Sequence, residues 1–299
     1  MKLIIDTDIG DDIDDAYALV IAATTDKIDL KAVTTVYRNS VERAKIATAI
    51  LEAAGKKNVT VAAGEDYPYS VPFTVEPFEK VCADGKPHVP QLLEGMENCL
   101  YSDVNAVDLI NEIASKYPNE VTLLELAPAT NAARAFEKSP ESFRKLKNVV
   151  MMGGHSGGTF AEWNIRCDPE AAAILLCSGV EITLIGIDVT KNATLTAEEE
   201  KLLVSTENAA LKICAKMLEK MHKDRPERST CMHDVVAFAE LTDNFCSYKM
   251  QRTEIPVVGE QKAKTIESEN GNLVKTAVGF DRTGFMRWLF EKTNISNHK

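Results

Sequence analysis

The sequence has no long hydrophobic run. No apolar stretch in its 299 residues approaches the roughly 20 residues that a helix needs to cross a bilayer. The N-terminus offers only Leu3-Ile4-Ile5 before Asp6, far short of the apolar region of a secretory signal. We therefore expect a protein of the cytoplasm that has no membrane as a partner.

Positive charge and paired cysteines are also scarce. Lys and Arg number 34 against 45 Asp and Glu, which leaves a formal net charge of −11. That excess repels phosphate backbones and anionic lipid surfaces, so we do not expect nucleic acid as a partner. The seven cysteines include no CxxC pair. Reduced thiols are expected, and neither a disulfide framework nor a structural zinc site.

Short apolar runs alternate with longer helical patterns along the chain. This alternation predicts an α/β fold, with a mostly parallel central sheet flanked by helices and a Rossmann-like core. No repeat or Pro/Gly-rich linker interrupts it, so residues 1–299 are interpreted as one domain. The expected strands are Leu3–Ile5, Leu30–Val36, Val59–Ala62, Val121–Leu126, Val149–Met152 and Ile182–Ile187. The expected helices are Asp14–Ala23, Val41–Ala54, Val104–Ser115, Asn131–Glu137 and Asp168–Cys177. The later part predicts a long helical segment at Ala197–His222, strands at Glu254–Val258 and Val274–Val278, and a terminal helix at Thr283–Glu291.

The first expected strand runs into an acidic segment. Six of the ten residues from Asp6 to Asp15 are aspartates. Two carboxylates about 4 Å apart repel by about 4 kcal/mol at an effective dielectric of about 20, so such a cluster calls for a cation. An all-oxygen site suits Ca²⁺ or Mg²⁺ and not zinc or copper. The alternative is an acidic turn that caps the helix expected from Asp14.

Polar residues also follow other expected strands, where the chemistry of open α/β sheets is usually found. Asn39 follows the second strand, where a turn or a helix cap is the alternative interpretation. Glu162 and Asn164 flank an aromatic residue after the fifth strand. These three side chains are candidates for binding a polar ligand.

Two further segments offer ligands or a proton. The loop after Leu126 leaves backbone carbonyls near a strand end, where they can bind a hard cation. His233 and Asp234 open an apolar helical run, either as an N-cap or as a proton donor and a cation ligand. The Gly-rich stretch 153–158 lacks the Lys-Ser/Thr pair of a phosphate-binding loop.

Taken together, these segments resemble the nucleoside hydrolases, the inosine–uridine nucleoside ribohydrolase family. The similar segments are DTDIGDDIDDA at 6–16, TTVYRN at 34–39, LAPATNAA at 126–133, MGG at 152–154, EWNIRCDPEAA at 162–172 and MHDVVA at 232–237. They follow the family order over most of the chain. The resemblance implies a nucleoside hydrolase-like fold with one tightly bound Ca²⁺. It also implies hydrolysis of the N-glycosidic bond of a ribonucleoside, and a homodimer or homotetramer.

The resemblance assigns a role to each candidate residue by its position. Calcium would be bound by Asp6, Asp8, Asp15, Asp234 and the backbone carbonyl of Leu126. Asp8 would also be the general base that deprotonates a calcium-bound water. The ribose hydroxyls would be held by Asp14, Asn39, Glu162 and Asn164. His233 would lie near the base and assist its departure.

The chain departs from the family pattern at three places. Three residues, 11–13, separate Gly10 from the Asp pair where the commoner motif has one, so Asp12 is an alternative for either position of the pair. The Asn that often precedes the Glu-x-Asn element is replaced by the region 158–160, which leaves contacts to the 5′-hydroxyl open. The usual His-Gly segment is poorly matched by 85–88, which leaves the base preference open.

Other functions stay possible on these residues. One is a non-catalytic protein that binds nucleosides or ribose on the same scaffold, and another is a hydrolase of a modified N-riboside. A phosphohydrolase of the haloacid dehalogenase type shares the Asp-x-Asp at a strand end. That class expects Thr or Val two residues beyond the second Asp, where this chain has Gly10.

Overall fold

A nine-stranded sheet lies at the centre of the computed structural model, which describes residues 1–70, 72–73 and 80–293. Its strands are β1 (Lys2–Thr7), β2 (Asp29–Thr35), β3 (Thr60–Ala63), β4 (Val121–Glu125), β5 (Asn148–Met152), β6 (Ile182–Ile185), β7 (Cys246–Glu254), β8 (Ile266–Glu267) and β9 (Asn272–Phe280). Their order across the sheet is β3-β2-β1-β4-β5-β6-β9-β7-β8. All are parallel except β7, which pairs antiparallel with β9 and β8. The predicted α/β fold with a mostly parallel sheet is therefore confirmed.

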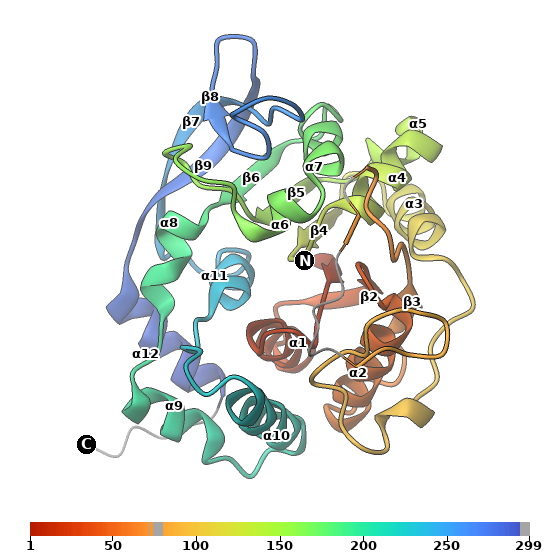
Figure 1. The fold of residues 1–299 in the computed structure, drawn as a ribbon, viewed down its shortest axis with the longest axis vertical. Coiled ribbons are helices and arrows are strands. Elements are labelled where there is room, and N and C mark those ends of the chain that lie inside the picture. The colour runs from red at the N-terminus through yellow and green to blue at the C-terminus, as the bar shows by residue number, and fades with distance from the viewer. Residues whose placement is uncertain (71, 74–79, 294–299) are drawn as a thin grey trace.

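Helices cover both faces of the sheet, because its apolar strands bury alternate side chains on opposite sides. Leu3 and Ile5 belong to one hydrophobic core, and Ile4 belongs to the other. The first core is covered by α1 (Asp14–Thr24), α2 (Ser40–Ala53), α10 (Ala209–Asp224), α11 (His233–Ala239) and α12 (Arg282–Lys292). The second is covered by α3 (Ala106–Lys116), α4 (Thr130–Lys138), α5 (Pro140–Phe143) and α7 (Pro169–Leu176). Figure 1 shows β7 and β9 at one side of the molecule, away from β2 and β3.

Several short helices complete the chain between these elements. They are η1 (Met96–Asn98), α6 (Trp163–Cys167), α8 (Ile187–Thr190), η2 (Lys191–Ala193) and α9 (Ala197–Val204). None of the helices in the described part of the chain has the length and hydropathy to cross a membrane.

The strand order reverses between β1 and β4. From β1 the chain builds β2 and β3 on one side, then returns to build β4, β5 and β6 on the other. Asp6 of β1 is therefore in register with Thr34 of β2 on one side and with Glu125 of β4 on the other. Connections that diverge in this way leave a crevice at the carboxyl ends of the strands, where ligands of open α/β sheets bind.

The predicted helical segment Ala197–His222 is wrong as a single helix. The chain forms α9 and α10 there, separated by 205–208. Both helices begin at strong caps: Thr196 and Glu199 form a capping box for α9, and the Asn208 side chain accepts from Ala210 N and Leu211 N in α10. Local side chain-to-backbone bonds of this kind compete with a continuous helix.

The predicted strand Glu254–Val258 is also wrong. The observed strand, β7, ends at Glu254, where the predicted one begins. Pro256 has no N–H to donate to a neighbouring strand, and its carbonyl instead accepts from Ala263 N at 2.8 Å in a turn. In β6 the apolar run continues past the strand end, so Ile187 opens α8 and is not part of the strand.

Candidate active site

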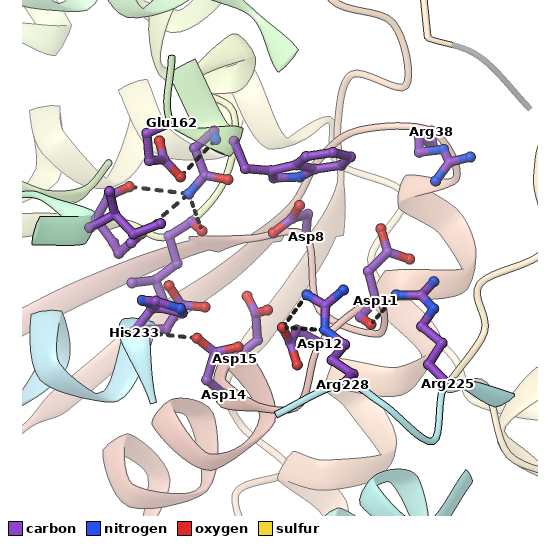
Figure 2. Close-up of a pocket in the computed structure, with 16 residues that line it drawn as sticks. Asp8, Asp11, Asp12, Asp14, Asp15, Arg38, Glu162, Arg225, Arg228 and His233 are labelled. Carbon is purple, nitrogen blue, oxygen red and sulfur yellow. Dashed lines mark hydrogen bonds and ion pairs between the residues drawn. The ribbon is translucent and has the colours of Figure 1, made fainter. Parts of the chain in front are cut away.

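A cavity of about 320 Å³ opens beyond the carboxyl ends of the strands around the switch point. This volume lies in the range of small-molecule sites. Figure 2 shows the labelled side chains around a common space. Eight of the ten residues selected from the sequence line it, namely Asp8, Asp14, Asp15, Leu126, Glu162, Asn164, His233 and Asp234.

The acidic loop between β1 and α1 turns at Gly10. The φ angle of Gly10 is +114°, a value that side chains rarely adopt. A Cβ at this position would also lie 2.3 Å from Cγ1 of Val89. Gln91 N donates to the Gly10 carbonyl at 3.0 Å, so the segment 89–91 holds the loop from outside. Glycine is therefore required for the turn that leads from Asp8 to α1.

A buried arginine holds the same loop from α2. The guanidinium of Arg43 donates to the carbonyls of Asp8 and Ile9 and pairs with the Asp11 carboxylate at 2.8 Å. Its Nε donates to the Tyr37 carbonyl at 2.9 Å. Because the side chain of Arg43 is only 1% exposed, its positive charge acts with little screening by water. Arg43 thus partly compensates the negative charge of the acidic loop.

Three carboxylates meet at the wall of the cavity and are called the carboxylate cluster below. Oxygens of Asp14, Asp15 and Asp234 lie within 4.8 Å of one another, and all three residues are buried. Asp14 and Asp15 lie in the first turn of α1, and Asp234 in the first turn of α11. Asp234 N donates to Asp14 Oδ2 at 3.1 Å, and the Thr7 hydroxyl donates to Asp15.

Burial raises the pKa of every carboxyl group in this cluster. The pKa of Asp14 rises to about 8, through burial and then the charge of Asp12. The pKa values of Asp15 and Asp234 lie well above the ordinary value because they are buried beside other aspartates. Asp8, in the same cavity, has its pKa raised to about 7 by burial, although Arg43 opposes the shift. A nearby cation would favour the ionised forms and reverse these shifts.

The chemistry of the donors fits a hard cation. The cluster supplies carboxylate oxygens, and the carbonyl of Leu126 lies at the same cavity. Ca²⁺ and Mg²⁺ bind through oxygen, whereas Zn²⁺ and Cu²⁺ prefer nitrogen and sulfur ligands. Three carboxyl groups this close and this deeply buried need either protons or a cation for their stability. The carboxylate cluster is thus able to hold a metal ion.

Comparison with known proteins agrees with this geometry. The family model of the inosine-uridine preferring nucleoside hydrolases matches residues 3–287. The chain belongs to this family. Uridine nucleosidase 1 of Arabidopsis thaliana is 31% identical over 83% of this chain and 76% of that protein. The non-specific ribonucleoside hydrolase RihC of Escherichia coli O139:H28 is 29% identical over 97% of each chain.

Solved nucleoside hydrolases share the fold as well. The purine-preferring ribonucleoside hydrolase of Gardnerella vaginalis superposes with a TM-score of 0.82 at 27% identity, over 98% of each chain. The plant nucleoside hydrolase PpNRh1 superposes with a TM-score of 0.81 at 25% identity, over 99% of each chain. The nucleoside hydrolase fold is therefore present along nearly the whole chain.

The Glu-x-Asn element of this family member forms the wall opposite the carboxylate cluster. Glu162 is the N-cap of α6, and its carboxylate accepts from Asn164 N at 3.0 Å and from Gly154 N at 3.0 Å. The Asn164 side chain donates to the carbonyls of Leu126 at 3.0 Å and Met152 at 3.1 Å. These bonds fix both side chains and connect the ends of β4 and β5 at the cavity.

His233 lies at the N-terminus of α11 beside Asp234. Its Nδ1 is 2.7 Å from the hydroxyl of Thr190, which orients the ring. Burial lowers the pKa of His233 to about 4, so the imidazole is neutral at physiological pH. A neutral ring with Nδ1 engaged leaves Nε2 for a ligand.

Asp12 is not one of the three residues of the carboxylate cluster. Its carboxylate pairs with Arg228 at 2.5 Å, and Figure 2 shows the two side chains joined at the cavity wall. Arg225, from the same α10–α11 connection, donates to the Asp11 carbonyl at 3.5 Å. The two extra residues of the acidic loop therefore face arginines, and the Asp14–Asp15 pair lies in the cluster with Asp234.

Two of the selected residues, Asp6 and Asn39, are not among those that line the cavity. Asp6 is fully buried and accepts from the Thr34 hydroxyl at 2.5 Å and from Asn131 Nδ2 at 2.8 Å. The Asn39 side chain caps α2 through Glu42 N at 3.2 Å, as the alternative interpretation expected.

Several residues at the cavity were not selected from the sequence. They are Asp11, Arg38, Met152, Trp163, Ile187, Arg225 and Arg228, and the cavity is also lined by Asp12, which was considered only as an alternative for the Asp pair. Trp163 is 48% exposed, which is a large fraction for an indole. Its position between Glu162 and Asn164 was a signal for its place at the site. Arg225 and Arg228 follow α10 in a segment without a local motif, and only the tertiary fold brings them to the acidic loop.

Proposed function

We propose that this protein hydrolyses the N-glycosidic bond of ribonucleosides, giving free base and ribose, with one bound Ca²⁺. The observation that carries this proposal is the convergence, at one cavity, of the carboxylate cluster, Asp8, the Glu162–Asn164 pair and His233. Relatives whose names describe uridine nucleosidase and ribonucleoside hydrolase activities support it.

The reaction requires stabilised positive charge and an activated water. Cleavage of a ribosyl C–N bond passes through an oxocarbenium-like state, as glycoside hydrolysis does. In this proposal Asp8 takes the proton of the attacking water, and the bound cation would keep the Asp8 carboxylate ionised for this role although burial raises its pKa. Bound to Asp8, Asp15, Asp234 and the Leu126 carbonyl, Ca²⁺ would supply a site that acidifies water and holds the ribose 2′ and 3′ oxygens.

The ribose is oriented by side chains on both walls. Asp14 lies beside the proposed metal ligands, and Glu162 and Asn164 line the same cavity from the start of α6. Because Glu162 and Asn164 are already held by backbone groups, they bind the sugar hydroxyls with little loss of side-chain entropy. In this proposal the fixed carboxylate and amide groups of Asp14, Glu162 and Asn164 favour a sugar that has the hydroxyl groups of ribose.

Asp15 and Asp12 make different contributions to calcium binding in this proposal. Asp15→Asn removes one charge from the carboxylate cluster, so we expect calcium affinity to fall by about 100-fold, since ligand charge sets the affinity of such sites. Asp12→Asn changes a residue paired with Arg228, and affinity is expected to stay within about threefold. Isothermal titration with Ca²⁺ compares the two. An equal loss in both variants would place Asp12 among the ligands.

His233 is proposed to assist the leaving base. With Nδ1 accepting from Thr190, the neutral ring would donate a hydrogen bond from Nε2 to the departing base. His233→Ala is therefore expected to lower kcat for inosine by about 10- to 100-fold, the loss of a hydrogen bond to a group that gains negative charge. Hydrolysis of 4-nitrophenyl β-riboside should change little, because its leaving group needs no proton. His222→Ala is the matched control, since His222 lies on α10 and pairs with Glu200 at 2.9 Å. An equal loss on both substrates would assign His233 to binding alone.

A panel of ribonucleosides tests the proposed function directly. Inosine, uridine, cytidine, adenosine and guanosine are assayed for reducing sugar with Ca²⁺ present and after chelation. We expect chelator-sensitive release of sugar, and the rates rank the bases. Ligand protection against thermal unfolding without any release would favour the non-catalytic binder. Calcium binding with no activity on any of the five would direct the search to modified N-ribosides.

The assembly is proposed to be a homodimer or homotetramer. Light scattering coupled to gel filtration measures the mass in solution, and a monomer at all concentrations would contradict this part of the proposal.

A further inference from the structure

A small hairpin packs against the N-terminal turn of α2, beside the acidic loop. Val81 and Pro87 form an antiparallel bridge, and Cys82 N donates to the Lys86 carbonyl at 2.8 Å. Gly85, with φ of +83°, makes the turn between them. The two sides of this hairpin carry Cys82 and His88, which therefore lie near each other in space.

Both side chains meet Glu42 of α2. His88 Nδ1 is 2.9 Å from Glu42 Oε1, and Cys82 Sγ is 3.5 Å from the same oxygen. One ligand atom from each of the three residues lies within 4.8 Å of the others. The second oxygen of Glu42 accepts from Val89 N at 2.7 Å, which fixes the carboxylate in place. The three side chains are each partly buried.

This arrangement has the dimensions of a three-ligand metal site. With zinc bonds of about 2.0–2.3 Å and tetrahedral angles, ligand atoms lie about 3.3–3.6 Å apart. The oxygen–sulfur distance at Glu42, 3.5 Å, lies in this range, and the oxygen–nitrogen distance, 2.9 Å, is about 0.4 Å shorter than its lower limit. Three protein ligands leave a fourth position for water.

We propose that Glu42, Cys82 and His88 form a second metal site, which binds a borderline-soft divalent ion of the zinc type. Its sulfur, nitrogen and oxygen donors favour Zn²⁺ over Ca²⁺. The carboxylate cluster, built from oxygen alone, has the opposite preference. The two sites thus bind different ions in the same solution.

The second site has a mechanical connection to the active site. The residues that follow His88 in the chain pack against Gly10. Val89 Cγ1 lies so close that a Cβ on Gly10 would be 2.3 Å from it, and Gln91 N donates to the Gly10 carbonyl at 3.0 Å. A metal ion bound to α2 and to both sides of the hairpin would hold this segment against the loop that carries Asp8. Zinc binding would therefore stiffen one wall of the cavity.

Second-site binding is tested with Co²⁺ as a spectroscopic probe for Zn²⁺. The reduced full-length protein is first saturated with Ca²⁺ and then titrated with Co²⁺. We expect one equivalent to bind with a thiolate-to-cobalt charge-transfer band, which Zn²⁺ then abolishes. No such band at a large molar excess of Co²⁺ would overturn the proposal.

Variants assign the band to these ligands. Cys82→Ser should abolish it and raise the Kd for Zn²⁺ by at least about 100-fold, more than the loss of an outer-shell partner costs. Cys177→Ser, at an exposed cysteine, is the matched control and should leave the titration unchanged. A band that persists in Cys82→Ser or disappears in Cys177→Ser would contradict the assignment.

A second readout covers the case in which Cys82→Ser does not fold. In the unsubstituted protein, Zn²⁺ should slow the alkylation of Cys82 by iodoacetamide. Mass spectrometry measures the rate of this alkylation. In His88→Gln the protection should be lost or weakened by about tenfold or more. Equal protection in both proteins would show that the imidazole is not a ligand and would overturn the three-residue site.

Discussion

Asp8→Asn is expected to lower kcat on the best nucleoside by about 10²–10⁴, the usual contribution of a general base. Asn keeps the size of the side chain but cannot take a proton from water. Asp8 lies at the cavity beside the proposed calcium ligands, so the group lost is the carboxylate placed to take that proton. Steady-state rates of sugar release at saturating Ca²⁺ measure the effect.

The control for this variant is Asp26→Asn, the same substitution at an exposed residue beyond the C-terminal end of α1. It should leave kcat unchanged. Calcium content of the Asp8→Asn protein, measured by elemental analysis, separates loss of the base from loss of the metal. Full activity of a calcium-loaded Asp8→Asn protein would exclude Asp8 as the base.

Removal of calcium is expected to make stability fall as pH rises. The pKa values of Asp8 and Asp14 are raised to about 7 and about 8 in the folded state, from an ordinary value of 3.8. The folded chain therefore binds more protons than the unfolded chain between about pH 4 and about pH 8. The contribution of these two carboxyl groups to the free energy of unfolding is complete below about pH 4 and is lost as the pH rises to about 8. Thermal unfolding with chelator measures this decline.

Saturation with Ca²⁺ should oppose the decline, because calcium competes with protons for the same carboxylates. Calcium at about 1,000 times its Kd adds about 4 kcal/mol to the free energy of unfolding. The difference in Tm between calcium-loaded and chelated protein should therefore widen with pH. Asp15→Asn is expected to reduce this difference, and a difference that narrows with pH would contradict calcium binding at the cluster.

The sheet could be predicted from the sequence because its strands are short, apolar and buried on both sides. The helix break at 205–208 could not, since apolar residues continue at helical spacing on both sides of it and only the Asn208 cap marks where α10 begins. The strand β7 was missed because its side chains are largely exposed, so no apolar run marked it.

Site residues that lie in a sequence motif were predicted. Those that only the tertiary fold brings to the cavity were missed. Asp234 lies 220 residues from Asp14, and only the family resemblance associates the two in the sequence. The pairing of Asp12 with Arg228 joins residues 216 apart, and no motif surrounds Arg228. The same holds for Glu42, Cys82 and His88, because the absence of a CxxC pair argued against a zinc site, while two separate segments, α2 and the hairpin, bring the three side chains of the proposed second site together.

The acidic loop and its arginines have a consequence for protein engineering. Asp11 and Asp12 pair with Arg43 from α2 and with Arg228 from the α10–α11 connection. Deleting residues 11 and 12, to match the shorter motif of the family, would leave both guanidinium groups without these partners. Grafting the longer loop into a relative would likewise require both arginines. Loop and arginines therefore form one module that must be transplanted together.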